Sequence, residues 1–277
     1  MRNVDFCITT FLRPDGLYNL LESINKYYPD ANIYVAQQGD MYEPFERFDK
    51  FKVIFFKLPF DFGLSASRNY LVKNTKAKYV LILEDDFIFN IDTRIEKMVK
   101  LLEYHEKFGT NVGVVGGLVK ENWINLTFEH KLLRKGNILL HLPDGDNWRD
   151  LGSIRYKYTD CVLNFALFRR EVFDDIMWDD KLKLADHNDF YLRLKDTKWN
   201  VIYTPCVWLD TKKVNSAEYK KYKKRKDFLR MLLKKHKLEK IVYVDGMVRE
   251  LKDGVYKTYT MLPNELKEFF NKLNIKL

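Results

Sequence analysis

The stretch YVLILEDDFIF, residues 79–89, governs how the rest of the chain is interpreted. Its first five residues form an apolar run typical of a buried strand, and three carboxylates follow in Glu84, Asp85 and Asp86. Carboxylates packed this closely repel one another, and removal from water makes the repulsion more costly. A positive partner is therefore expected at this strand end, and the candidates are a metal ion, an Arg or Lys side chain, or water alone.

Strand and helix patterns alternate on both sides of this stretch. The strand-like runs lie at 4–9, 32–36, 52–56, 79–83 and 112–119, and helical spacing of apolar residues marks 14–28, 65–74 and 93–108. Apolar strands that alternate with helices predict an α/β fold with a mostly parallel sheet and helices on both faces. Ligands of such sheets bind beyond the carboxyl ends of the strands, where the acidic triplet lies.

Length and composition set the broad class. The chain has 277 residues, of which 46% are hydrophobic and 15% aromatic, as in globular proteins of one large domain or one domain plus an appendage. Its three cysteines, Cys7, Cys161 and Cys206, are far apart and lack metal-site spacing, which favours buried thiols in a reducing compartment. We find neither a membrane-spanning apolar run nor a signal-peptide core, and expect a cytoplasmic protein.

The positive charge is concentrated in residues 212–237. This segment holds twelve Lys and Arg against two acidic residues, while the whole chain carries +9. Apolar residues recur at helical spacing among the lysines, which predicts a basic amphipathic helix. Such a helix suits peripheral contact with an anionic membrane at its inner face, although a solvated helix packed on the main domain fits equally well. We consider nucleic acid an unlikely partner.

The residues around the triplet suit phosphate and metal chemistry. A hard divalent cation prefers oxygen ligands and would stabilise charge on a departing diphosphate. In the upstream stretch LPFDFGLSASRN, residues 58–69, Gly63 lets the backbone approach a ligand closely. Arg68, on the helix that follows, could reach the triplet or a phosphate. A solvated acidic turn and simple helix capping are the plainer interpretations of these two features.

Together these stretches resemble family-2 glycosyltransferases of the GT-A fold. The order TTFLRPDGLYNLLESI (9–24), DFGLSASRNYLV (61–72) and YVLILEDDFIF carries the resemblance, which is strongest to β-1,4-N-acetylgalactosaminyltransferase-type members. It spans roughly residues 4–210. It implies a Rossmann-like GT-A fold, a nucleotide-sugar donor that is commonly UDP-linked, and a divalent metal, usually Mn²⁺ with Mg²⁺ as the alternative, held by a DxD-like motif.

Position by position, the resemblance assigns the metal to Asp86, with Glu84 at the other outer place of the motif. Asp85 is the central residue, near the donor sugar or ribose. Many GT-A enzymes add a His after the last core strand. This chain has Asp210 in that region, as a substitute ligand or a solvated loop residue.

The resemblance also implies a nucleotide pocket. Thr9, Phe11 and Arg13 match the loop after the first strand, which normally lines it. The family often has acidic residues at the end of the second strand. Gln38 stands there in this chain, and Asp40 is the alternative contact to the base.

The catalytic base is expected in WDDKLKLADHNDFYLRLK, residues 178–195. An inverting transfer needs one general base within hydrogen-bond reach of the acceptor hydroxyl. The resemblance places that carboxylate at a helix start, and the candidates are Asp186, Asp189 and His187, with Asp186 favoured. A helix-start Asp is equally common as a simple N-cap.

We therefore expect a metal-dependent, inverting glycosyltransferase that moves a hexose or N-acetylhexosamine to a hydroxyl of a glycan or lipid-linked acceptor. Residues 1–211 would form its GT-A domain, with a nucleotide-sugar half at 1–120 and an acceptor half at 121–211. Residues 212–277 would add a small α+β appendage of a basic helix, a β-hairpin and a closing helix.

Two other functions fit parts of the sequence. A sugar-phosphate nucleotidyltransferase also uses an α/β sheet and a metal-binding acid, but the stretch TTFLRPDG is a poor match to its Gly-rich phosphate loop. A non-catalytic protein that binds glycans or nucleic acids would leave the acidic triplet without a role. The separate histidines, His105, His130, His141 and His236, show no ligand spacing and are interpreted as core or surface residues.

Overall fold

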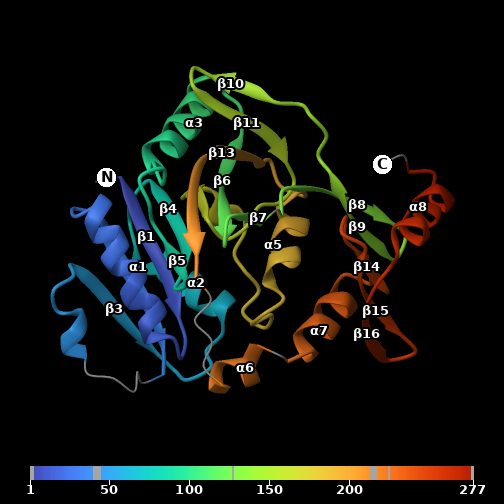
Figure 1. Ribbon diagram of the computed structural model, residues 1–277, viewed down its shortest axis with the longest axis horizontal. Coiled ribbons are helices and arrows are strands. Elements are labelled where there is room, and N and C mark those ends of the chain that lie inside the picture. Colours follow the sequence, from blue (N-terminus) through green and yellow to red (C-terminus); the bar gives the residue numbers. More distant parts are fainter. Residues whose placement is uncertain (1–2, 40–44, 127, 213–216, 224, 276–277) are drawn as a thin grey trace.

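The computed structural model describes residues 3–39, 45–126, 128–212, 217–223 and 225–275. Its main feature is an eleven-stranded sheet in the order β10-β11-β13-β6-β12-β4-β1-β2-β3, with β5 paired to β13 and β7 to β6 (Figure 1). The strands are β1 (Val4–Thr10), β2 (Asn32–Gln38), β3 (Val53–Leu58), β4 (Tyr79–Glu84), β5 (Phe87–Ile88), β6 (Val112–Glu121), β7 (Ile124–Leu126), β10 (Arg149–Leu151), β11 (Ile154–Thr159), β12 (Ala166–Arg169) and β13 (Asn200–Thr211).

The sheet combines parallel strands with antiparallel insertions. Strands β3, β2, β1 and β4 pair in parallel, and so do β6 and β13. Strand β12 lies between β4 and β6 and runs antiparallel to both. Because β1, β2 and β4 end at the same edge, the loop after β1 and the acidic triplet after β4 are neighbours.

Helices cover both faces of the sheet, as predicted. On β4, Leu81 packs with α1 (Pro14–Tyr27) and α3 (Ile95–Lys107), whereas Val80 and Ile82 pack with α2 (Leu64–Asn74) and α5 (Asp186–Leu194). This alternation follows from the two-residue period of a strand, and it explains why a strand buried on both sides is apolar throughout. The short helix α4 (Val172–Asp175) and the 3₁₀ turn η1 (Phe45–Phe48) complete this part.

A second, five-stranded sheet lies beside the main one, in the order β16-β15-β14-β9-β8. Its elements are β8 (His130–Lys135), β9 (Ile138–Pro143), β14 (Lys240–Val242), β15 (Met247–Lys252), β16 (Val255–Thr260) and helix α8 (Pro263–Lys272). Strand β9 pairs in parallel with β14, so this sheet takes strands from both sides of the boundary predicted at residue 211. The predicted β-hairpin and closing helix are present, but they complete a sheet that the acceptor half begins.

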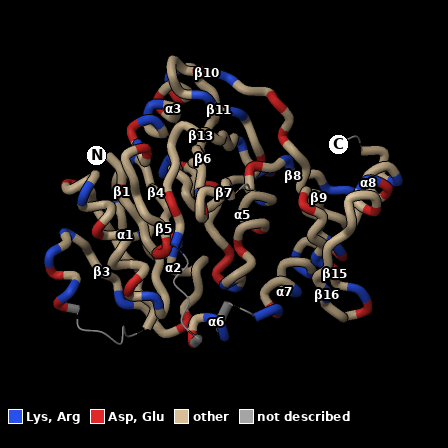
Figure 2. Tube along the Cα trace, in the orientation of Figure 1, with Lys and Arg blue, Asp and Glu red and all other residues tan. Residues whose placement is uncertain are grey.

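The basic segment forms two short helices, α6 (Ala217–Lys223) and α7 (Asp227–Lys235), and not the single helix predicted. Lysines and arginines cluster along both (Figure 2). Leu232 and Leu233 of α7 are fully buried in the core shared with α5. The apolar side of α7, predicted as a lipid-facing stripe, is therefore used for packing within the protein. In the described residues, every helix is too short or too polar to cross a membrane.

Candidate active site

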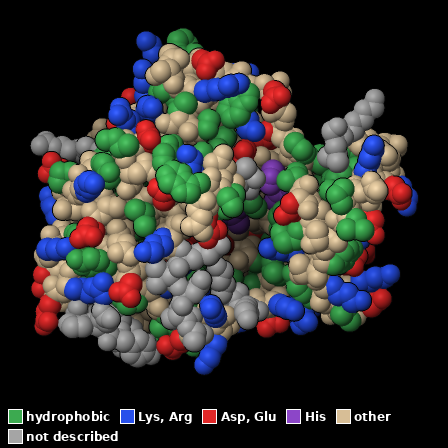
Figure 3. All heavy atoms as spheres, in the orientation of Figure 1, with side chains coloured by type: hydrophobic (Ala, Val, Ile, Leu, Met, Phe, Trp, Pro, Cys, Tyr) green, Lys and Arg blue, Asp and Glu red, His purple; other side chains and the backbone are tan. Residues whose placement is uncertain are grey.

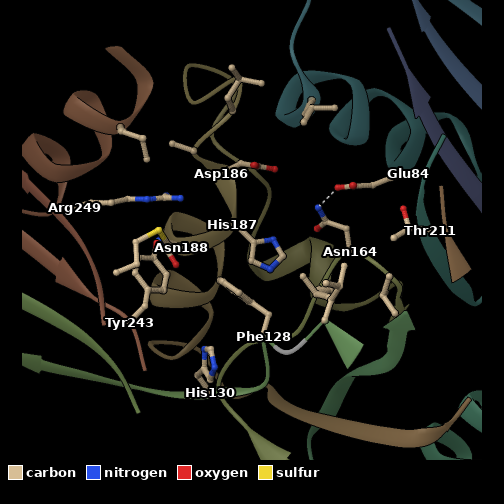
Figure 4. A pocket seen from close by; sticks show the side chains of 18 of the residues that line it. Glu84, Phe128, His130, Asn164, Asp186, His187, Asn188, Thr211, Tyr243 and Arg249 are labelled. Carbon is tan, nitrogen blue, oxygen red and sulfur yellow. Dashed lines mark hydrogen bonds between the residues drawn. The ribbon is translucent and has the colours of Figure 1, made fainter. Parts of the chain in front are cut away.

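A cavity of about 630 Å³ lies between the carboxyl edge of the main sheet and the second sheet. Figure 3 shows the surface hollowed here, with histidine atoms visible inside. Figure 4 shows Glu84 and Thr211 on one wall and Tyr243 and Arg249 on the opposite wall. The predicted acidic strand end therefore faces a space large enough for a sugar.

The acidic triplet divides between this cavity and the protein interior. Glu84 and Asp86 line the cavity, whereas Asp85 is fully buried. Thr10 donates a hydrogen bond to Asp85 (2.7 Å), and Arg13 forms ion pairs with both Asp85 and Asp86, the latter at 2.8 Å. Burial raises the pKa of Asp85 to about 7, with Asp86 and Glu84 adding to the rise and Arg13 opposing it.

A second arginine connects the triplet to helix α5. Arg68 is completely buried, and its guanidinium contacts both Glu84 (3.5 Å) and Asp186. Asn164 also donates a hydrogen bond to Glu84 (2.6 Å; Figure 4). Burial raises the pKa of Glu84, but Arg68 and Asn164 outweigh it, so that the pKa is lowered overall and the group is ionised. Among the described residues, two arginines thus form ion pairs with the triplet.

The three candidate bases on α5 lie in different surroundings. Asp186 and His187 line the cavity, and Asp189 is not among the described residues that do. The Asp189 carboxylate is fully buried and accepts hydrogen bonds from Arg193 (2.7 Å) and His236 (2.7 Å). Lys235 adds an ion pair to it at 2.6 Å. Burial alone would raise the pKa of Asp189, but these donors lower it well below its usual range.

His187 is held in one tautomer by the backbone. Its Nε2 lies 2.6 Å from the carbonyl oxygen of Val162, and because a carbonyl can only accept, Nε2 carries the proton. The ring packs edge-on against Phe128 at 4.6 Å between centroids. Burial lowers the pKa of His187, so the ring is neutral near pH 7 and Nδ1 is its basic atom.

The predicted nucleotide-binding residues meet in a second, much smaller pocket. Thr9, Phe11, Arg13, Gln38 and Gly63 all line it, although they come from three separate segments of the chain. Its volume is about 30 Å³, the share of a single water molecule. The structure thus brings these residues together, but the pocket that they line is too small for a nucleotide base.

Two tyrosines of helix α6, together with Arg225, close this pocket. The Tyr222 ring packs edge-on against Phe11 (5.1 Å) and Phe60 (5.5 Å). The Arg13 guanidinium lies 4.4 Å from the ring centroid of Tyr219. Arg225 then binds both oxygens of Asp61, at 2.6 and 2.7 Å.

Gly63, which lines this pocket, has a backbone conformation that favours glycine. Gly63 has φ +100°, and a Cβ there would come within 2.6 Å of the Lys183 side chain. Its N–H donates to Gln38 Oε1 at 2.8 Å, so the amide of Gln38 holds the loop. Close approach of this backbone to a ligand stays a prediction.

Two predicted site residues remain, Asp40 and Asp210. Asp40 lies outside the described residues. Asp210 accepts a hydrogen bond from Asn90 (3.0 Å), and its neighbour Thr211 lines the cavity instead, because successive strand residues point to opposite faces. The structure therefore does not bring Asp210 to the cavity wall that Asp86 forms.

Other polar residues of the site were not predicted from sequence. They are Asn164, Asn188, Thr211, Tyr243 and Arg249 at the large cavity and Tyr219, Tyr222 and Arg225 at the small pocket. The only signal for Asn164 was a polar residue within the apolar run VLNFALF. Tyr243 and Arg249 had none, since they reach the cavity from the second sheet.

Residues 5–177 match the model of the family described as Glycosyl transferase family 2. The chain belongs to this family. It is 36% identical over 192 residues to Beta-1,4 N-acetylgalactosaminyltransferase 2 of Mus musculus, covering 68% of this chain and 35% of that protein. It is 33% identical over 196 residues to Beta-1,4 N-acetylgalactosaminyltransferase 1 of Homo sapiens, and this match covers 68% of this chain and 35% of that protein. The chain thus spans about a third of the length of these relatives.

Solved structures support the fold. GalNAc-T7 with UDP, GalNAc and Mn²⁺ matches with a TM-score of 0.57 at 11% identity, over 76% of this chain and 43% of that chain. S. aureus TarS 1-349 matches with a TM-score of 0.51 at 14% identity, over 73% of this chain and 60% of that chain. The predicted family and the predicted GT-A fold are both confirmed.

Proposed function

We propose that this protein transfers a hexose or N-acetylhexosamine from a nucleotide-diphosphate sugar, with UDP as the nucleotide, to a hydroxyl of a glycan or glycolipid. One observation carries the proposal. Two strand-end carboxylates, Glu84 and Asp86, and a candidate base, Asp186, line the same cavity at the carboxyl edge of the parallel strands. Family membership and the N-acetylgalactosaminyltransferase relatives support the choice of reaction and sugar.

The residues around the triplet fit a divalent cation, Mn²⁺ first and Mg²⁺ as the alternative. Among the described contacts, four carboxylates gather around the guanidinium groups of Arg13 and Arg68, and Glu84 and Asp86 line the cavity. Asp86 and Glu84 would supply the oxygen ligands, with the remaining positions left to water and phosphate. When bound, the ion would stabilise charge on the departing diphosphate. Arg13 has to release Asp86 for this, and the Mn²⁺ in the GalNAc-T7 structure supports the assignment.

Asp186 is the general base that the geometry favours. It begins helix α5, lines the cavity and is fixed from behind by the buried Arg68. Asp186 would accept the proton of the acceptor hydroxyl while that oxygen attacks the anomeric carbon and the nucleotide diphosphate leaves from the opposite face. A single displacement of this kind inverts the anomeric centre. Asp189 serves less well, because Arg193, Lys235 and His236 already contact its carboxylate.

The nucleotide would occupy the small pocket after α6 moves. Thr9, Phe11 and Gln38 line a space that holds about one water, so a base can enter only when Tyr219 and Tyr222 withdraw. Part of the binding free energy is then spent on opening, which weakens the apparent affinity of the closed form.

A transfer assay with UDP-N-acetylhexosamines and UDP-hexoses tests the proposal. We expect one donor to release UDP in proportion to glycosylated acceptor, with Mn²⁺ required. Asp86→Asn should remove this activity, and Asp210→Asn, a matched change on a nearby carboxylate that faces Asn90, should retain it. Consumption of added pyrophosphate, with release of sugar 1-phosphate and UTP in place of UDP, would indicate nucleotidyl transfer. Retention on glycan or nucleic acid without metal-dependent donor binding would indicate a binding protein.

A further inference from the structure

Two histidines and a cysteine that are far apart in the sequence converge in the interior. His130 lies on β8, His141 on β9, and Cys161 on the loop after β11. Among the described residues they form the one group of three or more His, Cys, Asp or Glu whose ligand atoms lie within 4.8 Å of one another. The acidic triplet forms no such group.

The spacing of the histidines is that of two ligands on one metal ion. Their Nδ1 atoms are 3.3 Å apart. Zinc binds imidazole nitrogen at about 2.0–2.1 Å, and two such ligands of a tetrahedral ion are then about 3.3 Å apart. A direct hydrogen bond between the rings would also be long at this distance.

The two histidines are in the protonation state that metal ligands need, whereas burial raises the pKa of the Cys161 thiol, which would have to give up its proton when the ion binds. His141 is fully buried, and burial lowers its pKa to about 3, with His130 and His187 lowering it further and Asn188 raising it. Burial also lowers the pKa of His130, so both rings are neutral. Neutral imidazole is the form that binds metals.

The thiol of Cys161 completes the group. It is buried and donates to the carbonyl of Phe128 at 3.2 Å, while the Cys161 backbone forms an isolated bridge with His130. Metal binding would replace this weak hydrogen bond with a thiolate–metal bond, and the thiol proton would be released to solvent. Two nitrogens and one sulfur are a donor set typical of Zn²⁺.

We propose that His130, His141 and Cys161 bind a Zn²⁺ ion, with a water in the fourth position, at a site separate from the acidic triplet. His130 lines the large cavity, which gives the ion and the water a route of entry (Figure 4). The ion would join strands β8 and β9 of the second sheet to the loop that carries Cys161 and Val162.

The bound ion would hold the part of the cavity wall that contains His187 in place. Val162, next to Cys161, accepts the hydrogen bond from His187, and Phe128, two residues before His130, packs on the same ring. Fixing both segments would fix the orientation of His187. The proposal does not depend on which sugar or nucleotide the protein uses.

Cobalt spectroscopy tests the site on the full chain. The chelator-treated protein is titrated with Co²⁺, which gives a near-ultraviolet charge-transfer band only when a thiolate binds it, and Zn²⁺ content is measured by mass spectrometry after reconstitution. We expect the wild type to give the band and to retain about one Zn²⁺ per chain. Because the triplet offers only oxygen ligands, Asp86→Asn should give the same band.

Two cysteine variants distinguish metal binding at Cys161 from binding to any other thiol of the protein. Cys161→Ser should lose the band and weaken Zn²⁺ binding by tenfold or more, and Cys206→Ser, whose thiol lies near Ser153 and Arg155, should keep both. Absence of the band in the wild type would overturn the proposal without reference to any variant. An unchanged band in Cys161→Ser, or its loss in Cys206→Ser alone, would also overturn it.

Discussion

The two hollows on either side of the acidic triplet differ sharply. The large cavity measures about 630 Å³, and the pocket under α6 measures about 30 Å³. Leu64 and Leu184 line both, so the two are adjacent. The protein is open where we expect the sugar and acceptor, and closed where we expect the nucleotide base.

This difference indicates that the donor site is built from two parts with different mobility. The open side is lined by groups on the sheet and on α5, which the buried Arg68 links together. The closed side depends on a seven-residue helix held by ring contacts and by the Arg225–Asp61 pair. We expect the first part to be preorganised and the second to move during each donor-binding event.

The largest effect should come from the open side. Asp186→Asn keeps the size of the side chain but removes its basicity, so transfer should fall by about 10²-fold or more. UDP affinity in the presence of Mn²⁺ should change little, which isothermal titration would measure. Circular dichroism should establish that the variant folds, because Arg68 loses an ionic partner. Full transfer activity in a folded Asp186→Asn protein would assign the base elsewhere.

Asp189, three residues further along α5, lies outside both hollows and should affect stability more than transfer. Asp189→Asn should lower the free energy of unfolding at pH 7 by about 2 kcal/mol, because a buried carboxylate that Arg193, Lys235 and His236 contact is lost. Asp227→Asn is the control, since Asp227 is exposed and, among the described residues, pairs only with Arg230.

The pH dependence follows from the lowered pKa of Asp189. The folded pKa lies below the unfolded value of about 3.9, so the carboxylate stabilises the fold above that pH and the contribution is lost as pH falls through lower values. Urea titrations at pH 7 and pH 3 should show the difference between wild type and Asp189→Asn shrinking at the lower pH. A difference that stays constant would remove Asp189 ionisation as its cause.

The smallest effect should come from the closed side. Tyr222→Ala removes the ring that packs on Phe11 and Phe60, so opening costs less and UDP should bind about 3- to 10-fold more tightly. Tyr259→Ala, a change at an exposed tyrosine on β16, should leave UDP affinity unchanged. Weaker UDP binding by Tyr222→Ala would mean that the ring contacts the bound base and does not merely cover its site.

The sequence predicted the parts that depend on short-range pattern. The apolar run of β4 and the following carboxylates placed Glu84 and Asp86 at a sheet edge, and the structure puts both on the cavity wall. The alternating strands and helices predicted the two covered faces of the sheet. These inferences succeed because periodicity and burial are local properties of the chain.

The rest depends on contacts between distant segments. His130, His141 and Cys161 have no motif spacing, and only the pairing of β8 with β9 and the bridge to Cys161 brings them together. Asp186 and Asp189 look equivalent in sequence, yet one turn of helix places them in different surroundings. Leu232 and Leu233 fit a membrane helix by pattern, and nothing local distinguishes lipid from the protein core that buries them.

The central claim is that Asp86 and Glu84 hold a cation against the diphosphate of a nucleotide sugar. Thermal unfolding of the wild type and Asp86→Asn, each with UDP, with Mn²⁺ and with both, tests it most directly. We predict that UDP and Mn²⁺ together raise the midpoint of the wild type more than either alone, and that Asp86→Asn loses this additional rise. Equal rises in the two proteins, or no joint effect in the wild type, would contradict the claim.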